Sequence, residues 1–322
     1  MADGAKAAPG VARIVRAIES LPTGRYLLAI SGGSDSMVLL DAFTRFRSDA
    51  AAVATFDHRT GPAARRAASL TRVEGERRGL IVYSGRRRRG GRATEAAWRE
   101  ARQAFLRARA LSTNSTIVTA HTRDDQLETV VMRALRDARQ TSARGLAAMY
   151  AYNRRETVVR PLLDISRADV ASYARLRAIP YVEDPTNADR NYLRNRLRLD
   201  LLPAIERVSP GFSESVLRLS RAAADWRASV DEIADCLGAL LLPNGAVVVP
   251  SDALRSFDDA SLAILWPALA ERAGVVLDRR GTERLIAFTN HGGPAGHVPL
   301  AGGARAERNA ATFVIRASGA RE

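Results

Sequence analysis

The sequence contains few cysteine, lysine and aromatic residues, and it has no long apolar run. Cys236 is the only cysteine among 322 residues, which excludes an internal disulfide framework and a zinc site built from several thiolates. No apolar run approaches the roughly 20 residues that a membrane-spanning helix needs. Residues 1–10 lack the basic cluster and apolar stretch of a signal peptide. We therefore expect a cytoplasmic protein that does not contact a membrane.

The basic residues are almost all arginine, because Lys6 is the only lysine in the chain. With 49 basic and 35 acidic residues, the formal net charge is +14 and the pI is near 11.0. Clustered cations gain free energy by displacing counterions from a phosphate backbone, so a nucleic acid is the leading candidate partner. A GC-rich genome that favours arginine codons explains the same composition equally well. Composition alone leaves both explanations open.

The first half of the chain alternates short apolar runs with longer segments of helical periodicity. This alternation predicts an α/β domain with a doubly wound, mostly parallel sheet. The predicted strands are Tyr26–Ile30, Ala52–Phe56, Leu80–Ser84 and Thr116–Thr119. The predicted helices between and after them are Ser36–Arg47, Ala63–Arg78, Thr94–Leu111 and Asp124–Leu135.

The second half predicts a helical segment followed by a small α+β domain. Ser166 to Asp169 resembles a capping box, so a helix to about Arg177 should follow. Further helices are predicted over Tyr192–Leu202, over Gly211–Leu241 and near Ala260–Ala273, and short strands over Val247–Val249, His297–Leu300 and Thr312–Ile315. We predict three parts: a lead-in at 1–22, a catalytic domain at 23–208, and a helical and α+β domain at 209–322.

A glycine-rich loop follows the first predicted strand and leads directly into a helix. It consists of Ser31, Gly32, Gly33, Ser34, Asp35 and Ser36. Glycines let the backbone approach a phosphate closely, and the helix N-terminus supplies amide donors and a positive dipole end. A carboxylate in such a loop repels phosphate unless a divalent cation lies between them, so Asp35 is a candidate Mg²⁺ ligand. The alternative is that these residues only cap the helix.

This loop resembles the SGGxDS signature of the PP-loop ATP pyrophosphatases, which use ATP to adenylate a carbonyl or amide oxygen. The resemblance implies ATP as a substrate, but it does not choose the acceptor. Thiolating members work through cysteines, which a single late cysteine cannot supply. Glutamine-dependent members need an amidotransferase nucleophile, usually an N-terminal cysteine, and residues 1–3 are Met-Ala-Asp. A different incoming nucleophile is therefore expected.

Further segments resemble the tRNA(Ile)-lysidine synthases, a family of this superfamily, over roughly residues 25–205. In chain order they are Asp57-His58, Glu95–Arg102, Thr119–Thr129, Arg160–Leu163, Glu183–Asn187 and Arg194–Arg198. Two places depart from the family pattern. Thr60-Gly61 stands where the family usually has Leu-Arg, and Asp137-Ala138-Arg139 replaces a glycine-rich turn. Both departures concern loops that could contact substrate.

The resemblance implies a two-step reaction on a tRNA. ATP adenylates the C2 oxygen of the cytidine at the first anticodon position, and the ε-amine of free lysine then displaces AMP. The implied partners are lysine and an isoleucine tRNA with a CAU anticodon, with Mg²⁺ as cofactor. The C-terminal domain is expected to contact the tRNA, and a homodimer is an open option.

The second step needs an amine that is held and deprotonated beside the activated base. Asp125 and Glu128 lie three positions apart, so on a helix they share one face, and His121 lies one turn earlier. Paired carboxylates suit an ammonium group, so we predict catalytic roles for these three residues and for Asp35. The alternative is a solvated helix face with salt bridges.

Other residues are candidates for binding the nucleotide or the tRNA. Asp57, Arg99 and Arg102 are predicted to bind the nucleotide, whereas His58 is equally well explained as a turn residue. Arg194, Asn195, Arg196 and Arg198 are predicted to bind tRNA, although a basic surface helix is a common alternative. The run Arg86–Arg89 is predicted to be a flexible loop with nonspecific RNA affinity.

Two other functions stay open at this point. One is a PP-loop tRNA-modifying paralogue that acts on another base or amine. The other is a tRNA-binding protein that has lost catalysis. The presence of Asp35, Asp125 and Glu128 favours an enzyme over a binding protein.

Overall fold

The computed structural model describes residues 9–87, 95–136, 146–153, 157–291, 293 and 295–318. The side chains of residues 95, 96, 136 and 153 are outside this description. The chain divides into two compact units, and the boundary between Arg218 and Leu219 falls inside helix α10 (Phe212–Cys236). The sequence placed this boundary earlier, between residues 208 and 209. Within the described ranges, no helix is both long and apolar enough to cross a membrane.

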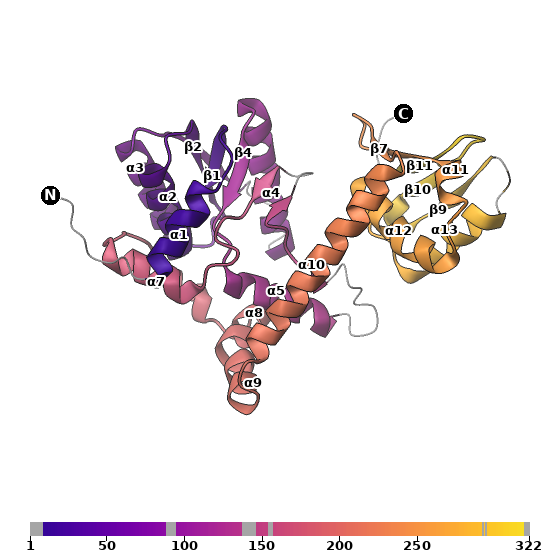
Figure 1. Ribbon diagram of the computed structural model, residues 1–322. Helices are drawn as coiled ribbons and strands as arrows, with labels where there is room; N and C mark the ends of the chain where they lie inside the picture. Colours follow the sequence, from indigo (N-terminus) through magenta and orange to yellow (C-terminus); the bar gives the residue numbers. More distant parts are fainter. Residues whose placement is uncertain are drawn as a thin grey trace. The chain divides into compact units, whose positions relative to one another are not determined.

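The first unit is built on a six-stranded sheet in the order β3-β2-β1-β4-β6-β5 (Figure 1). Its strands are β1 (Tyr26–Ala29), β2 (Ala51–Asp57), β3 (Ile81–Arg86), β4 (Thr116–Thr119), β5 (Tyr152–Asn153) and β6 (Val158–Val159). All neighbouring strands are parallel except β5 and β6. The predicted α/β class with a mostly parallel sheet is therefore confirmed. The short β5–β6 edge was not predicted, because two-residue strands carry no periodicity.

Helices pack on both faces of this sheet. They include α1 (Pro9–Glu19), α2 (Ser34–Phe46), α3 (Pro62–Arg77), α4 (Glu95–Thr113) and α7 (Arg167–Leu176), while α5 (Arg123–Arg136) contributes Leu127 and Val131 to a separate apolar cluster. Leu28 of β1 belongs to the core that includes α1, α2 and α7. Leu27, the next residue, belongs to the core on the α4 side, because successive strand residues point to opposite faces.

The N-terminal segment corrects one prediction. Residues 1–22 were expected to be a lead-in outside the catalytic domain, but Pro9–Glu19 forms helix α1. Ile14 and Ile18 are fully buried, and Arg13 donates to Asp169 of α7 over 2.7 Å. Burying two such side chains contributes roughly 1.5–3 kcal/mol each, which is enough to attach a short helix to the core.

The helices after β6 place side chains over the sheet edge. Helix α7 begins as predicted, because the Ser166 hydroxyl accepts the Asp169 amide over 3.1 Å. The helix expected over 192–202 is instead interrupted. A 3₁₀ turn, η1 (Pro185–Ala188), precedes α8 (Leu193–Arg196), a π-helical turn η2 (Leu197–Leu201) and α9 (Leu202–Val208). Leu197 and Leu202 pack on Leu127 of α5 and thereby hold this layer against α5 within the first unit.

The second unit contains a five-stranded antiparallel sheet in the order β7-β8-β11-β10-β9 (Figure 1). Its elements after α10 are β7 (Leu240–Leu241), β8 (Val247–Pro250), α11 (Ser251–Leu254), α12 (Asp259–Arg272), α13 (Arg279–His291), β9 (Gly296–Pro299), a 3₁₀ turn (Ala301–Gly303), β10 (Arg305–Arg308) and β11 (Thr312–Arg316). Buried Trp266 donates to Thr289 over 3.0 Å and stacks edge-on against Phe313. The predicted small α+β domain is present, while β7, β10 and α13 were not predicted.

Candidate functional site

The glycine-rich loop joins β1 to α2 and leaves the helix start open. Gly32 has φ +85°, and a Cβ there would lie 2.5 Å from the carbonyl oxygen of Ala67. Only glycine therefore fits. The Gly32 carbonyl accepts the Val182 amide over 2.9 Å, which fixes the loop from the other side. Gly33 is the N-cap of α2, and among the described residues no side chain caps that helix. Its first amides are thus available to an anion.

The serines of the loop have different surroundings. Ser36 is buried, and its hydroxyl donates to the Gly33 carbonyl over 2.9 Å while accepting the Ser31 amide at 3.2 Å. The hydroxyls of Ser31 and Ser36 lie 3.1 Å apart. Ser36 therefore braces the loop from inside, whereas Ser31 is exposed. The sequence predicted both as contacts to phosphate, and the geometry favours Ser31 for that contact.

Asp35 lies in the first turn of α2 with 29% of its side chain exposed. Burial raises its pKa to about 6, and nearby Asp125 and Asp124 add to the rise against Arg167. Its ionised form therefore gains from a bound cation. The described residues hold no group of three or more His, Cys, Asp or Glu suited to a metal. One carboxylate completed by substrate phosphates and water is, however, the arrangement that Mg²⁺ commonly takes.

Two carboxylates of α5 and two arginines form the carboxylate–arginine group, defined here as Asp125, Glu128, Arg167 and Arg194. Arg167 of α7 donates to Asp125 over 3.2 Å and to Glu128 over 3.3 Å. Arg194 of α8 donates to Asp125 over 2.8 Å and to Glu128 over 2.5 Å. Glu128 is 1% exposed. Arg167 also lies 3.9 Å from Asp35, so this group is continuous with the glycine-rich loop.

Local hydrogen bonds set the position of this group. Asp125 caps α5, because its second oxygen accepts the Thr122 amide over 2.8 Å and the Thr122 hydroxyl over 2.9 Å. Asp124 accepts the Arg167 amide over 2.7 Å and so ties the start of α7 to the start of α5. Burial raises the pKa of Asp125, but the Thr122 amide, Arg194 and Arg167 outweigh it and hold that pKa below its usual value.

Arg167 was missed by the sequence interpretation, although it directly follows the predicted cap Ser166. The four residues predicted to bind tRNA separate into different environments. The guanidinium of Arg194 faces carboxylates, and Arg196 is exposed. Asn195 donates to the carbonyls of Thr186 and Asp189 over 2.8 Å each, and Arg198 donates to that of Asn187 over 2.8 Å. Asn195 and Arg198 thus hold the η1 turn.

His121 follows β4 near Asp125. Its Nδ1 lies 2.8 Å from the hydroxyl of Thr119. Burial lowers its pKa to about 4, and Arg160, Arg102 and Arg194 lower it further while Asp125 opposes them. The imidazole is therefore neutral near pH 7. The structure brings His121, Asp125 and Glu128 to one region, as their spacing predicted.

Asp57 ends β2 at the carboxyl edge of the sheet, as predicted, but its carboxylate already bonds to other groups of the chain. One oxygen accepts the Arg59 amide over 2.8 Å, and the other lies 3.3 Å from Nε of Arg86. The Thr60-Gly61 departure has a structural role, because Gly61 is the N-cap of α3 with φ +149°. The Asp137–Arg139 departure lies outside the described residues.

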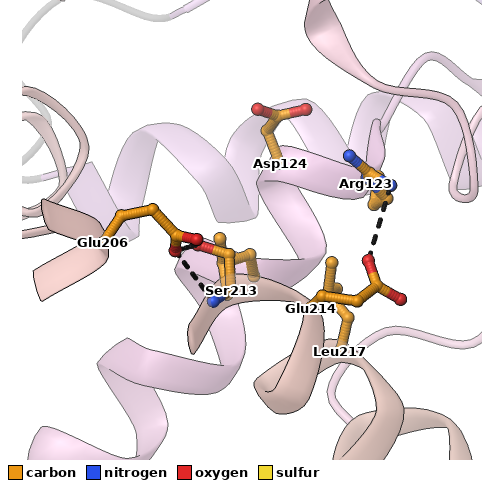
Figure 2. Close-up of a pocket in the computed structure, with 7 residues that line it drawn as sticks. Arg123, Asp124, Glu206, Ser213, Glu214 and Leu217 are labelled. Atoms are coloured by element: carbon orange, nitrogen blue, oxygen red, sulfur yellow. Dashed lines mark hydrogen bonds and ion pairs between the residues drawn. The ribbon is translucent and has the colours of Figure 1, made fainter. Parts of the chain in front are cut away.

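A pocket of about 320 Å³ opens beside Asp124 (Figure 2). It is lined by Arg123, Asp124, Leu127, Glu206, Ser213, Glu214 and Leu217. Glu206 accepts the amides of Gly211 and Ser213 over 2.6 and 3.0 Å, so it caps the start of α10. The carboxylates of Glu206 and Asp124 thus already accept backbone amides at the starts of helices.

The fold and the loop define an ATP-binding PP-loop domain. Residues 9–205 match the PP-loop domain family, which is more than half of the chain. A U34-tRNA thiolase, NcsA from Methanococcus maripaludis, shares the fold with a TM-score of 0.55 at 14% identity over 67% of this chain and 80% of its own.

Several relatives bear the name tRNA(Ile)-lysidine synthase. The one from Parasynechococcus marenigrum is 30% identical over 87% of this chain and 85% of its own length. Those from Ralstonia nicotianae and Thermus thermophilus are 37% and 32% identical over 69% and 93% of this chain. The chain covers 49% and 58% of these two relatives, or about half their length. The chain belongs to the tRNA(Ile)-lysidine synthase family.

Proposed function

We propose that the chain is an AMP-forming carbon–nitrogen ligase that makes lysidine in a tRNA. It adenylates the C2 oxygen of the first anticodon cytidine with ATP, and the ε-amine of lysine then replaces the adenylate. The observation that carries the proposal is the position of Arg167, which faces Asp35 at the loop and also Asp125 and Glu128 on α5. A phosphate site and a site for a cationic amine therefore adjoin.

In the first step the loop amides and the Ser31 hydroxyl bind the triphosphate. Asp35 holds Mg²⁺, which when bound neutralises charge on the pyrophosphate leaving group. Arg99 of α4, which was predicted together with Arg102 to bind the nucleotide, supplies further positive charge for it, whereas Nε of Arg102 is buried and the charge of Arg102 acts on His58. Asp57, whose carboxylate is used by Arg59 and Arg86, shapes the turn at the end of β2.

In the second step Asp125 and Glu128 hold the amine of lysine. Without substrate, Arg167 and Arg194 neutralise these carboxylates. An ammonium group must therefore replace one guanidinium. Arg194 is the one that leaves, because its side chain is 41% exposed against 30% for Arg167. After this exchange Arg194 is free to bind tRNA and the carboxylates bind the amine, as was predicted for each.

The ε-ammonium must lose one proton to solvent before its nitrogen has a free electron pair to attack the activated base, and the nitrogen loses a second proton as the C–N bond forms. His121 is the proposed acceptor, because burial keeps its imidazole neutral. Its pKa of about 4 makes it a weak base, so it accepts the proton only as the C–N bond forms and the amine becomes strongly acidic.

Product analysis tests this proposal. Incubation with ATP, labelled lysine and bulk tRNA should yield AMP and pyrophosphate, and nucleoside mass spectrometry should find lysidine. Both products should depend on tRNA, because the adenylated atom belongs to a base. Release of ADP and phosphate would refute the assignment. Product with another amine in place of lysine would favour the paralogue, and tRNA binding without AMP would favour the non-catalytic protein.

The finer assignments are part of the same proposal. The tRNA is an isoleucine tRNA with a CAU anticodon, the compartment is the cytoplasm, and the region from residue 209 onward contacts the tRNA. A transcript with uridine at the first anticodon position should not be modified. Sedimentation of the chain with and without tRNA tests for a homodimer.

A further inference from the structure

Several buried nitrogen atoms lie near the carboxyl ends of β2 and β3 without a hydrogen-bond partner in the described part of the chain. They are Nδ1 of His58, Nε and Nη1 of Arg87, Nε1 of Trp98 and Nε of Arg102. We call these four residues the donor cluster. His58 follows β2, Arg87 follows β3, and the other two belong to α4. None of them serves the glycine-rich loop or the carboxylate–arginine group.

The members of the cluster lie close to one another. The guanidinium carbon of Arg87 lies 5.8 Å from the centre of the Trp98 ring. His58 stacks edge-on against Phe56 at 5.1 Å, and Phe56 contacts Phe105 of α4 at 5.6 Å. Burial lowers the pKa of His58, and the charges of Arg102 and Arg87 lower it further. These contacts place both guanidinium groups near one imidazole.

The cluster carries an excess of positive charge. Burial lowers the pKa of Arg102, and the neighbouring charge of Arg99 adds to this effect. Asp57, the carboxylate that also acts on His58, is already bound by Arg86 and by the Arg59 amide. Buried donors without acceptors cost folding free energy, so the arrangement calls for an anionic ligand.

We propose that the donor cluster binds a phosphate group of the RNA strand, at a site separate from the glycine-rich loop. Two guanidinium groups and an indole N–H offer donors to the several oxygens of one phosphate, and His58 adds a further donor in the tautomer that carries its proton on Nδ1. Phosphate also occurs in ATP, but the glycine-rich loop follows β1 and already receives the triphosphate. The charged groups that act most strongly on Asp35 are Arg167, Asp125, Asp124 and Arg198, none of which belongs to the donor cluster.

Arg87→Gln tests the site, because it removes the charge while keeping a polar side chain. Filter binding of bulk tRNA over a range of salt concentrations should show affinity about tenfold lower. The slope of log affinity against log salt should become shallower by the amount expected for the loss of about one phosphate contact. ATP affinity, measured by calorimetry without RNA, should stay unchanged. Arg72→Gln on α3 removes the same charge at an exposed site paired with Glu76 and should change neither affinity.

Trp98→Phe gives a second measurement, since it removes one N–H donor and keeps an aromatic ring beside Arg87. The tRNA affinity should fall by a few fold with the salt slope unchanged, because no charge is lost. The melting temperature of Arg87→Gln should equal or exceed that of the parent, as a donor without an acceptor is removed. A lower melting temperature with normal tRNA binding would overturn the inference, because the cluster would then be structural.

Two further outcomes would also overturn it. Weaker ATP binding with normal tRNA binding would assign the cluster to the nucleotide, and unchanged affinities for both would leave it without a ligand. The inference rests on the proposed function only in taking RNA as the substrate. These assays measure binding without turnover, so a parent chain that binds tRNA but makes no lysidine contradicts the proposed function alone.

Discussion

The carboxylate–arginine group and the donor cluster both place arginines near the same edge of the sheet. The arginines of the first are neutralised by carboxylates, whereas those of the second are not. Arg167 and Arg194 each face two carboxylates at hydrogen-bond distance. Arg87 and Arg102 have buried nitrogen atoms that meet no acceptor in the described part of the chain. The first arrangement is complete without a ligand, so a cationic substrate must exchange with a guanidinium. The second is incomplete and can gain an anion without displacing a side chain.

The largest expected effect comes from Asp35→Asn, which removes the one carboxylate proposed to hold Mg²⁺. Pyrophosphate release should fall about 100-fold or more, because a metal ion stabilises the leaving group by several kcal/mol. Affinity for tRNA should stay nearly intact, since the arginines are unchanged. Gel-shift and pyrophosphate-release assays on one preparation measure both quantities. Asp252→Asn, at a side chain 83% exposed in the second unit, is the matched control and should alter neither. Equal loss of both activities would indicate a structural role for Asp35.

Glu128→Gln tests whether the paired carboxylates hold the amine. The substitution keeps the shape of the side chain but removes the charge that faces an ammonium group. A charge-assisted hydrogen bond contributes about 1.5–3 kcal/mol, so lysine use should weaken by roughly one to two orders of magnitude. Adenylation should survive, so the variant should release pyrophosphate with tRNA yet need far more lysine. Lysine titrations with both readouts separate the steps.

The structure also supplies a competing account of Glu128. Both of its oxygens bind guanidinium groups, so it could serve only to position Arg167 and Arg194 for phosphate. In that case Glu128→Gln would abolish pyrophosphate release at saturating ATP and leave lysine affinity unchanged. Glu76→Gln, at an exposed site on α3, controls for the loss of one carboxylate.

Asp35 should also limit the stability of the chain without ligand. Its pKa is raised from 3.8 to about 6, so the folded state binds more protons than the unfolded state between these values. Its contribution to stability is therefore most favourable below pH 3.8 and declines as the pH rises through about 6. The loss amounts to at most about 3 kcal/mol. At pH 7, Asp35→Asn should raise the free energy of unfolding measured in urea, and the gain should vanish near pH 4. A gain that is the same at both pH values would disprove the link to ionisation.

The sequence predicted those features that depend on local pattern. Helix α5 and strands β1, β2 and β4 follow apolar periodicity, and the start of α7 follows the Ser166 cap. The loop at Ser31–Ser36 was predicted from its glycines, and Gly32 indeed occupies a backbone conformation that favours glycine. The grouping of Asp125 with Glu128 followed from helical spacing alone.

Long-range partners were not predictable in this way. Arg167 lies 42 positions from Asp125 in the chain, and no spacing rule connects α7 to α5. Arg194 was predicted to face RNA because it lies in a basic segment, yet the interruption at η2 and the packing of Leu197 set it against Glu128. Helix α1 was missed because its amphipathic pattern, with Ile14 and Ile18 on one face, lies within a segment taken as a terminus.

The smallest effect is expected from Arg196→Gln. Arg196 extends the comparison to an arginine that is exposed, in contrast to those that face carboxylates and those that are buried without an acceptor. Arg196 is exposed on α8, and an exposed cation near RNA contributes mainly by releasing counterions. Its loss should weaken tRNA binding by only about threefold and reduce the salt slope by about one contact. Arg194→Gln should differ, because it leaves the buried Glu128 with one partner and should lower the melting temperature as well. Filter binding across salt concentrations, with thermal melts of both variants, measures the contrast. If Arg196→Gln lowers the melting temperature while the salt slope stays constant, Arg196 is a structural residue and α8 contributes no exposed contact to the RNA.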